Sequence, residues 1–129
     1  MLVGVVLGRG HTGLVLVHGR GDDPCTWLPW AQRFAQRGYQ ALAFDFEGFG
    51  GSRRGSGPDA RIDTDVAAAV EQLGRRGADR IVLIGSSMGA TATLVVVRHG
   101  HGASMLAYHD QGPRVLATVH RFVADHTGR

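Results

Sequence analysis

Short apolar runs alternate along the chain with segments of helical periodicity. The runs are rich in Val, Leu and Ile and lack the polar alternation of a strand with one face in water. Such runs are typical of strands covered on both faces, as in a parallel sheet. They predict strands at residues 2–7, 14–17, 41–46 and 80–84.

Between these runs, apolar residues recur every three or four positions. The clearest stripe predicts a helix within residues 59–76, which Gly77 closes. Similar patterns predict helices at 29–37, 90–97 and 113–125. Strands that alternate with helices predict an α/β fold, in which a mostly parallel sheet is flanked by helices on both faces. We expect one domain over residues 1–129.

Charge and cysteine content exclude some classes of protein. The net charge is +3 and all 14 basic residues are Arg, but they are spread along the chain instead of clustering on one element. We therefore expect no nucleic-acid partner. Cys25 is the only cysteine, which fits a reducing compartment. No apolar stretch approaches the ~20 residues of a membrane span, so we expect no membrane partner and a cytoplasmic protein.

The strongest chemical signal is Gly85-Ser86-Ser87-Met88-Gly89, a G-x-S-x-G pattern directly after a predicted strand and before a predicted helix. Glycines at both ends allow a sharp turn that exposes the central hydroxyl. The helix N-terminus behind it supplies free N–H groups and a partial positive charge. We therefore predict Ser87 as a nucleophile.

A second turn, His18-Gly19-Arg20-Gly21, follows the strand predicted at 14–17. In a parallel sheet this turn lies at the same edge as Ser87. We expect the backbone N–H of Arg20 to join that of Met88 in an oxyanion hole.

Residues 12–95 resemble the N-terminal half of bacterial α/β-hydrolases in the order and spacing of motifs. The matching segments are VLVHG at 15–19, DFEGFGGS at 45–52 and IVLIGSSMG at 81–89. The second segment is similar to the family's D-x-R-G-x-G-x-S loop, with Glu47 in place of the Arg. The resemblance implies a minimal α/β-hydrolase fold and a structural role for Asp45.

The resemblance also implies a histidine in a late His-Gly motif, with a small residue and an apolar run after it. His101 fits this pattern best, with His99 as its competitor and His109 as a weaker one. Its role would be general base toward Ser87 and then general acid toward the leaving alcohol.

The chain departs from the family pattern after Ser87. Only thirteen residues separate Ser87 from His101, and none of them is acidic, so the segment that normally carries the acid is absent there. Asp110, Glu47 and Asp45 are candidate acids, and a Ser–His dyad without an acid is the alternative.

Three geometries connect Ser87 with His101. One continuous helix over 88–98 would carry His101 to the wrong end of the sheet. A single helical turn followed by a strand at 94–97 would return it, although this crossover is very short. In the third geometry, His101 of one subunit serves Ser87 of another. The unpaired edge of a shortened sheet favours such a homodimer.

These observations predict a serine hydrolase that cleaves small, soluble acyl esters. We expect no metal or organic cofactor, because no Cys and His residues are spaced as a ligand set. The alternatives are a thioesterase or acyltransferase with the same serine chemistry, and a non-catalytic remnant that serves as a binding or assembly module.

Overall fold

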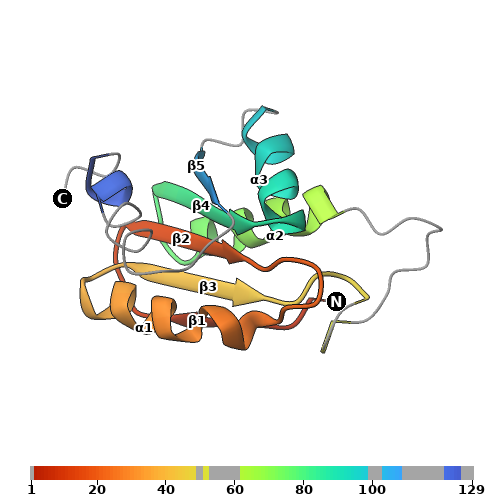
Figure 1. Cartoon of the computed structure of the whole chain (residues 1–129). Coiled ribbons are helices and arrows are strands. Elements are labelled where there is room, and N and C mark those ends of the chain that lie inside the picture. Colours follow the sequence, from red (N-terminus) through yellow and green to blue (C-terminus); the bar gives the residue numbers. More distant parts are fainter. Residues whose placement is uncertain (1, 49–50, 53–61, 99–102, 109–120, 126–129) are drawn as a thin grey trace.

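A five-stranded sheet forms the centre of the molecule (Figure 1). The computed structural model describes residues 2–48, 51–52, 62–98, 103–108 and 121–125. The strand order is β1-β3-β2-β4-β5. β1 runs antiparallel to β3 and the other neighbours are parallel. The strands are β1 (Gly4–Leu7), β2 (Thr12–Val17), β3 (Gln40–Phe44), β4 (Arg80–Ser86) and β5 (Ala103–Tyr108).

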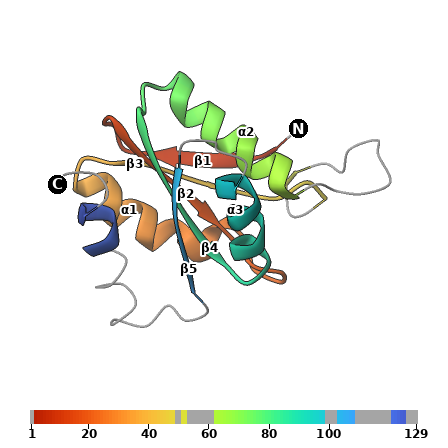
Figure 2. The same cartoon turned by 90° about the horizontal axis from the view of Figure 1, so that it is seen from above.

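Helices cover both faces of this sheet (Figure 2). On one face lie α1 (Leu28–Gln36), the 3₁₀ helix η1 (Pro24–Trp27) that leads into it, and a helical segment at 121–125. On the other face lie α2 (Ile62–Arg75) and α3 (Met88–Arg98). The crossovers that follow β2 and β3 therefore pack on opposite faces, as expected for a parallel sheet with two covered sides.

Alternate residues of each central strand supply two apolar cores. Along β2, Leu14 and Leu16 face the α1 side, while Val15 and Val17 face the α2 side. All four side chains are fully buried. Because both faces are covered, each strand is apolar at consecutive positions, which explains the uninterrupted runs in the sequence. Their partners include Trp27, Trp30 and Phe34 on the first side and Phe46, Val66 and Leu73 on the second.

The α/β class and the mostly parallel sheet that the sequence predicts are confirmed. Two details differ from the prediction. β5 follows α3 where no strand was expected. β1 pairs antiparallel at the edge of the sheet, a direction that the prediction of a mostly parallel sheet left open. α3 is continuous over Met88–Arg98, so the strand considered at 94–97 is wrong. Of the helix predicted at 113–125, residues 121–125 are helical and the rest lie outside the described residues.

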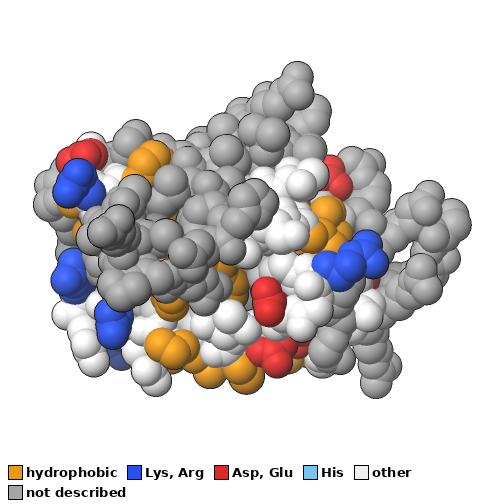
Figure 3. Space-filling model, in the orientation of Figure 1, with side chains coloured by type: hydrophobic (Ala, Val, Ile, Leu, Met, Phe, Trp, Pro, Cys, Tyr) orange, Lys and Arg blue, Asp and Glu red, His pale blue; other side chains and the backbone are white. Residues whose placement is uncertain are grey.

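The surface on the side of Figure 1 carries charges of both signs (Figure 3). Arg side chains lie at the two ends of this face, and acidic side chains lie both between them and beside the Arg at the left end. Among the described residues, none of the helices has the length and apolar character needed to cross a membrane.

Candidate active site

Ser87 occupies the sharp turn between β4 and α3. β4 ends at Ser86 and α3 begins at Met88, so one residue makes the whole change of direction. Ser87 has φ of 52°, and it is the one described non-glycine residue with positive φ. This left-handed conformation costs about 1–2 kcal/mol for an L-residue. Ser87 is also exposed. Backbone strain of this kind is typical of functional sites.

Two glycines make this turn sterically possible. A Cβ atom at Gly89 would lie 2.4 Å from the carbonyl oxygen of Val17 and 2.7 Å from that of His18. A Cβ atom at Gly85 would lie 2.6 Å from the carbonyl oxygen of Gly89. These obstacles are backbone atoms, which have little freedom to move. The first turn of α3 therefore packs directly on the end of β2 because both positions lack a side chain.

The loop that follows β2 lies against Ser87. Val17 pairs with Gly85 in the parallel register, so β2 and β4 end side by side. A Cβ atom at Gly19 would lie 3.2 Å from the Cβ of Ser87. Arg20 follows Gly19, and Met88 is the first residue of α3, where N–H groups lack intrahelical partners. The two residues predicted for the oxyanion hole thus belong to the two segments that adjoin Ser87.

His18 is a structural residue. Its side chain is fully buried, and its Nδ1 lies 2.8 Å from the carbonyl oxygen of Gly19. Its Nε2 accepts a hydrogen bond from the backbone N–H of Phe46 at 3.3 Å. These contacts require a neutral ring with the proton on Nδ1. Both ring nitrogens are used to connect the loops after β2 and β3, so His18 is not a general base.

Asp45 supports the loop after β3, as the family resemblance implied. One carboxylate oxygen accepts a hydrogen bond of 2.9 Å from the N–H of Gly51. The Ser52 hydroxyl donates to the carbonyl oxygen of Asp45 at 2.6 Å and accepts from the N–H of Val3. β2 separates β3 from β4 in the sheet, so Asp45 lies two strands from the turn at Ser87.

Glu47 belongs to the same loop and is held through its backbone. Its N–H donates to the carboxylate of Asp65 on α2 at 2.8 Å. Burial raises the pKa of the Asp65 carboxyl, the hydrogen bond from Glu47 N–H lowers it, and the nearby Glu47 charge raises it again. The net effect is a raised pKa. Because Asp65 lies on α2 and accepts the hydrogen bond from Glu47 N–H, it fixes the position of this loop relative to the helix.

Asp22 is an acidic residue near Ser87 that the sequence motifs did not indicate. A carboxylate oxygen of Asp22 and the Cβ of Ser87 both lie within 3.4 Å of the point where Gly19 would carry a Cβ. The N–H of Asp22 donates to the carbonyl oxygen of Gly19 at 3.2 Å, which closes a tight turn. The sequence signal was available, since Asp22 stands three residues after Gly19. Asp22 is thus an acidic residue close to Ser87.

The register of β5 shows which of its ends lies near Ser87. Tyr108, its last residue, pairs with Ser86, whereas Ala103, its first, pairs with Ile81. Ile81 is six residues before Ser87, a distance of roughly 20 Å along a strand. His101 and His99 precede β5, whereas His109 and Asp110 follow it. All four lie outside the described residues.

No group of three or more His, Cys, Asp or Glu side chains is arranged to bind a metal ion in the described part of the chain. Cys25 is exposed near the start of η1.

Residues 14–127 match the model of the alpha/beta hydrolase family. The match covers most of the chain, so this protein belongs to that family.

Named relatives show how much of a longer protein the chain matches. It is 33% identical over 99 residues to human protein ABHD14A, which covers 74% of this chain and 36% of that protein. It is 28% identical over 101 residues to protein YfhR of Salmonella typhimurium, and this match covers 76% of this chain and 34% of that protein. The chain thus spans about a third of the length of these relatives.

Solved structures support the same fold. Epoxide hydrolase VrEH1 from Vigna radiata superposes with a TM-score of 0.70 at 18% identity, over 96% of this chain and 42% of that one. An epoxide hydrolase from an endophytic Streptomyces superposes with a TM-score of 0.69 at 22% identity, over 82% of this chain and 33% of that one. At these identities the likeness concerns the fold alone.

Proposed function

We propose that this protein is a carboxylic ester hydrolase that uses Ser87 as its nucleophile and acts on small acyl esters. The observation that carries the proposal is the strained, exposed Ser87 at the end of β4, with the Gly19 loop against it. A buried strand and a helix hold this hydroxyl in place. A strained residue that serves only as a turn would more often be glycine.

The proposed reaction has two halves. The Ser87 Oγ attacks the acyl carbon while a histidine takes its proton, and the N–H groups of Arg20 and Met88 donate to the resulting oxyanion. The C–O bond to the alcohol then breaks, and the histidine returns the proton to the departing oxygen. Water repeats the sequence on the acyl-enzyme, which releases the acid and restores Ser87.

Two histidines compete for the role of base. The His-Gly motif favours His101, and the register of β5 favours His109. His109 directly follows Tyr108, which lies beside Ser86. His101 comes just before Ala103, at the end of β5 remote from Ser87. We therefore propose His109 as the base within one chain and His101 as the base only if a second copy supplies it. The acids proposed to orient such a histidine are Asp110, which follows His109 in the sequence, and Asp22, which lies close to Ser87.

Alanine replacements separate these two histidines. We expect His109→Ala to lower kcat/KM for an ester by about 10³-fold or more, because proton transfer is lost. His101→Ala should change it by less than about tenfold. The measurement is the steady-state hydrolysis of p-nitrophenyl acetate by both variants and the unaltered protein.

The opposite result would point to supply by a partner chain. In that case, mixing the His101→Ala and Ser87→Ala variants should restore activity, because a mixed dimer holds one intact pair. If both histidine variants remain fully active, neither residue is the base.

A series of p-nitrophenyl esters from acetyl to lauroyl tests the proposed substrate class. We expect kcat/KM to be highest for the shortest acyl groups, because the described residues around Ser87 form an exposed turn. An epoxide offered in parallel tests the activity named for the solved neighbours, and we expect no turnover. A strong preference for long acyl chains would contradict the proposal.

A further inference from the structure

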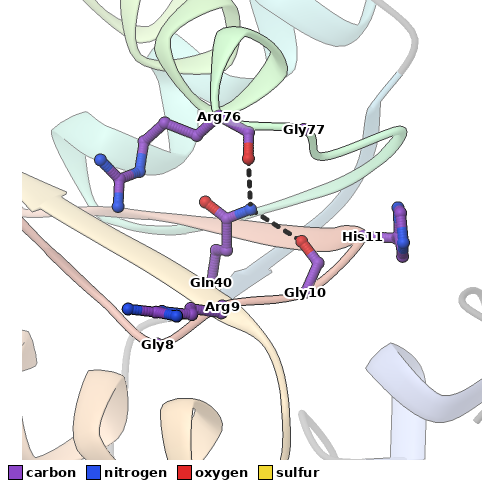
Figure 4. Close-up of a pocket in the computed structure, with 7 residues that line it drawn as sticks. All are labelled: Gly8, Arg9, Gly10, His11, Gln40, Arg76 and Gly77. Atoms are coloured by element: carbon purple, nitrogen blue, oxygen red, sulfur yellow. Dashed lines mark hydrogen bonds between the residues drawn. The ribbon is translucent and has the colours of Figure 1, made fainter.

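A cavity of about 460 Å³ lies at the end of the sheet where the parallel strands begin, and Ser87 lies at the other end, where β4 stops (Figure 4). The cavity is formed by the turn before β2, the first residue of β3 and the turn between α2 and β4. Its volume is within the range of small-molecule sites. The residues that line it are Gly8, Arg9, Gly10, His11, Gln40, Arg76 and Gly77.

Gln40 presents an unpaired oxygen in the wall of this cavity. The residue is 3% exposed, and its Nε2 donates to the carbonyl oxygens of Gly10 at 2.7 Å and Arg76 at 3.1 Å. These two bonds fix the orientation of the amide, because a flipped amide would place its oxygen against two other acceptors. The Oε1 atom is buried and has no hydrogen-bond partner. A buried acceptor of this kind costs about 1–3 kcal/mol unless a donor reaches it.

Two arginines add positive charge beside this oxygen. Figure 4 shows the guanidinium groups of Arg9 and Arg76 on the same side of the Gln40 amide, the side to which Oε1 points. Neither group forms an ion pair with a described residue. His11 points away from them and lies 3.9 Å from the carboxylate of Asp79. The wall therefore combines two strong cationic donors with one neutral acceptor.

We propose that this cavity binds a phosphate group that carries one proton, either free phosphate or a phosphate monoester. The charged oxygens of the phosphate accept hydrogen bonds from Arg9 and Arg76, and its P–OH group donates to Gln40 Oε1. A phosphate has enough oxygens for two guanidinium groups and one further contact. A carboxylate has two oxygens, which a single guanidinium already satisfies.

The lone acceptor distinguishes between anions. Sulfate and phosphodiesters carry no proton at neutral pH, so they would leave Gln40 Oε1 unpaired and place negative charge against it. A nucleic-acid backbone is therefore a poor ligand, whereas a free phosphate or a phosphorylated small molecule fits. The site lies roughly 20 Å from Ser87, the length of β4, so it is separate from the ester site.

Isothermal titration calorimetry on the whole chain, at one pH near neutrality and constant ionic strength, tests this inference. The probes are inorganic phosphate, phenyl phosphate, dimethyl phosphate and sulfate. We expect both protonatable phosphates to bind at least about tenfold more tightly than sulfate and dimethyl phosphate. Tighter binding of phenyl phosphate than of inorganic phosphate would identify an organic monoester as the ligand, and the reverse would identify free phosphate.

Arginine variants locate the site. Arg9→Gln and Arg76→Gln should each weaken phosphate binding about tenfold, since each removes a charged donor. Arg33→Gln, at an exposed position on α1, is the matched control and should leave binding unchanged. Equal binding of phosphate and sulfate, equal weakening by all three variants, or no binding at millimolar phosphate would overturn the inference. Because the readout is binding, these results do not depend on ester hydrolysis.

Discussion

Replacing Ser87 with alanine is expected to lower ester hydrolysis by about 10⁴-fold or more, to a rate close to background. In the proposed reaction this hydroxyl forms the acyl-enzyme, and other groups cannot replace it at that point in space. The fold should survive, because Ser87 is exposed and alanine tolerates its left-handed φ about as well as serine does. Steady-state rates and circular dichroism on the same preparations check both statements.

Ser86→Ala is the matched control for this variant. Ser86 is the last residue of β4 and precedes Ser87, so its replacement alters the same turn and leaves the Ser87 hydroxyl in place. We expect its rate to stay within a few-fold of that of the unaltered protein. If Ser87→Ala retained substantial activity, or if both variants lost it equally, Ser87 would not be the nucleophile.

Replacing Gly89 with alanine is expected to destabilise the protein by about 3 kcal/mol or more. The new Cβ would lie 2.4 Å from the Val17 carbonyl oxygen, a backbone atom in the centre of the sheet. α3 would have to move away from β2, which disturbs packing and the turn at Ser87 together. Urea denaturation should show the loss as a lower midpoint.

Gly74→Ala provides the contrasting substitution. Gly74 lies in α2, and a Cβ there would meet no atom within 4 Å. Alanine is the better helix former, so we expect a gain of about 0.5–1 kcal/mol. The same exchange of glycine for alanine should thus have opposite signs at the two positions. A Gly89→Ala variant as stable as the unaltered protein would contradict the close packing of α3 on β2.

The parts of the fold with two covered faces could be predicted from the sequence. β2, β3 and β4 are buried on both sides, and this requirement leaves uninterrupted apolar runs. β5 was missed because residues 103–108 read Ala-Ser-Met-Leu-Ala-Tyr, a mixed segment without β-branched residues. The direction of β1 could not be predicted from the sequence either, since the hydrophobic pattern of a strand does not encode whether its neighbour is parallel.

The candidate site was predictable where it depends on backbone geometry. Gly85 and Gly89 mark the turn in the sequence because no other residue fits there, and this locates Ser87 between them. The proximity of Asp22 to Ser87 depends on how β2 and β4 end side by side, which is a tertiary feature. The choice between His101 and His109 depends on the register of β5 against β4, and a motif in one strand carries no information about register.

Reaction with a fluorophosphonate, followed by intact-mass measurement and peptide mapping, is the most direct test of whether the Ser87 hydroxyl is an activated nucleophile. The reagent phosphonylates a serine hydroxyl only where that hydroxyl is activated and accessible. We expect one adduct per chain, located on Ser87 and absent from the Ser87→Ala variant. A folded protein that forms no adduct, or that carries it on another residue, would contradict the account.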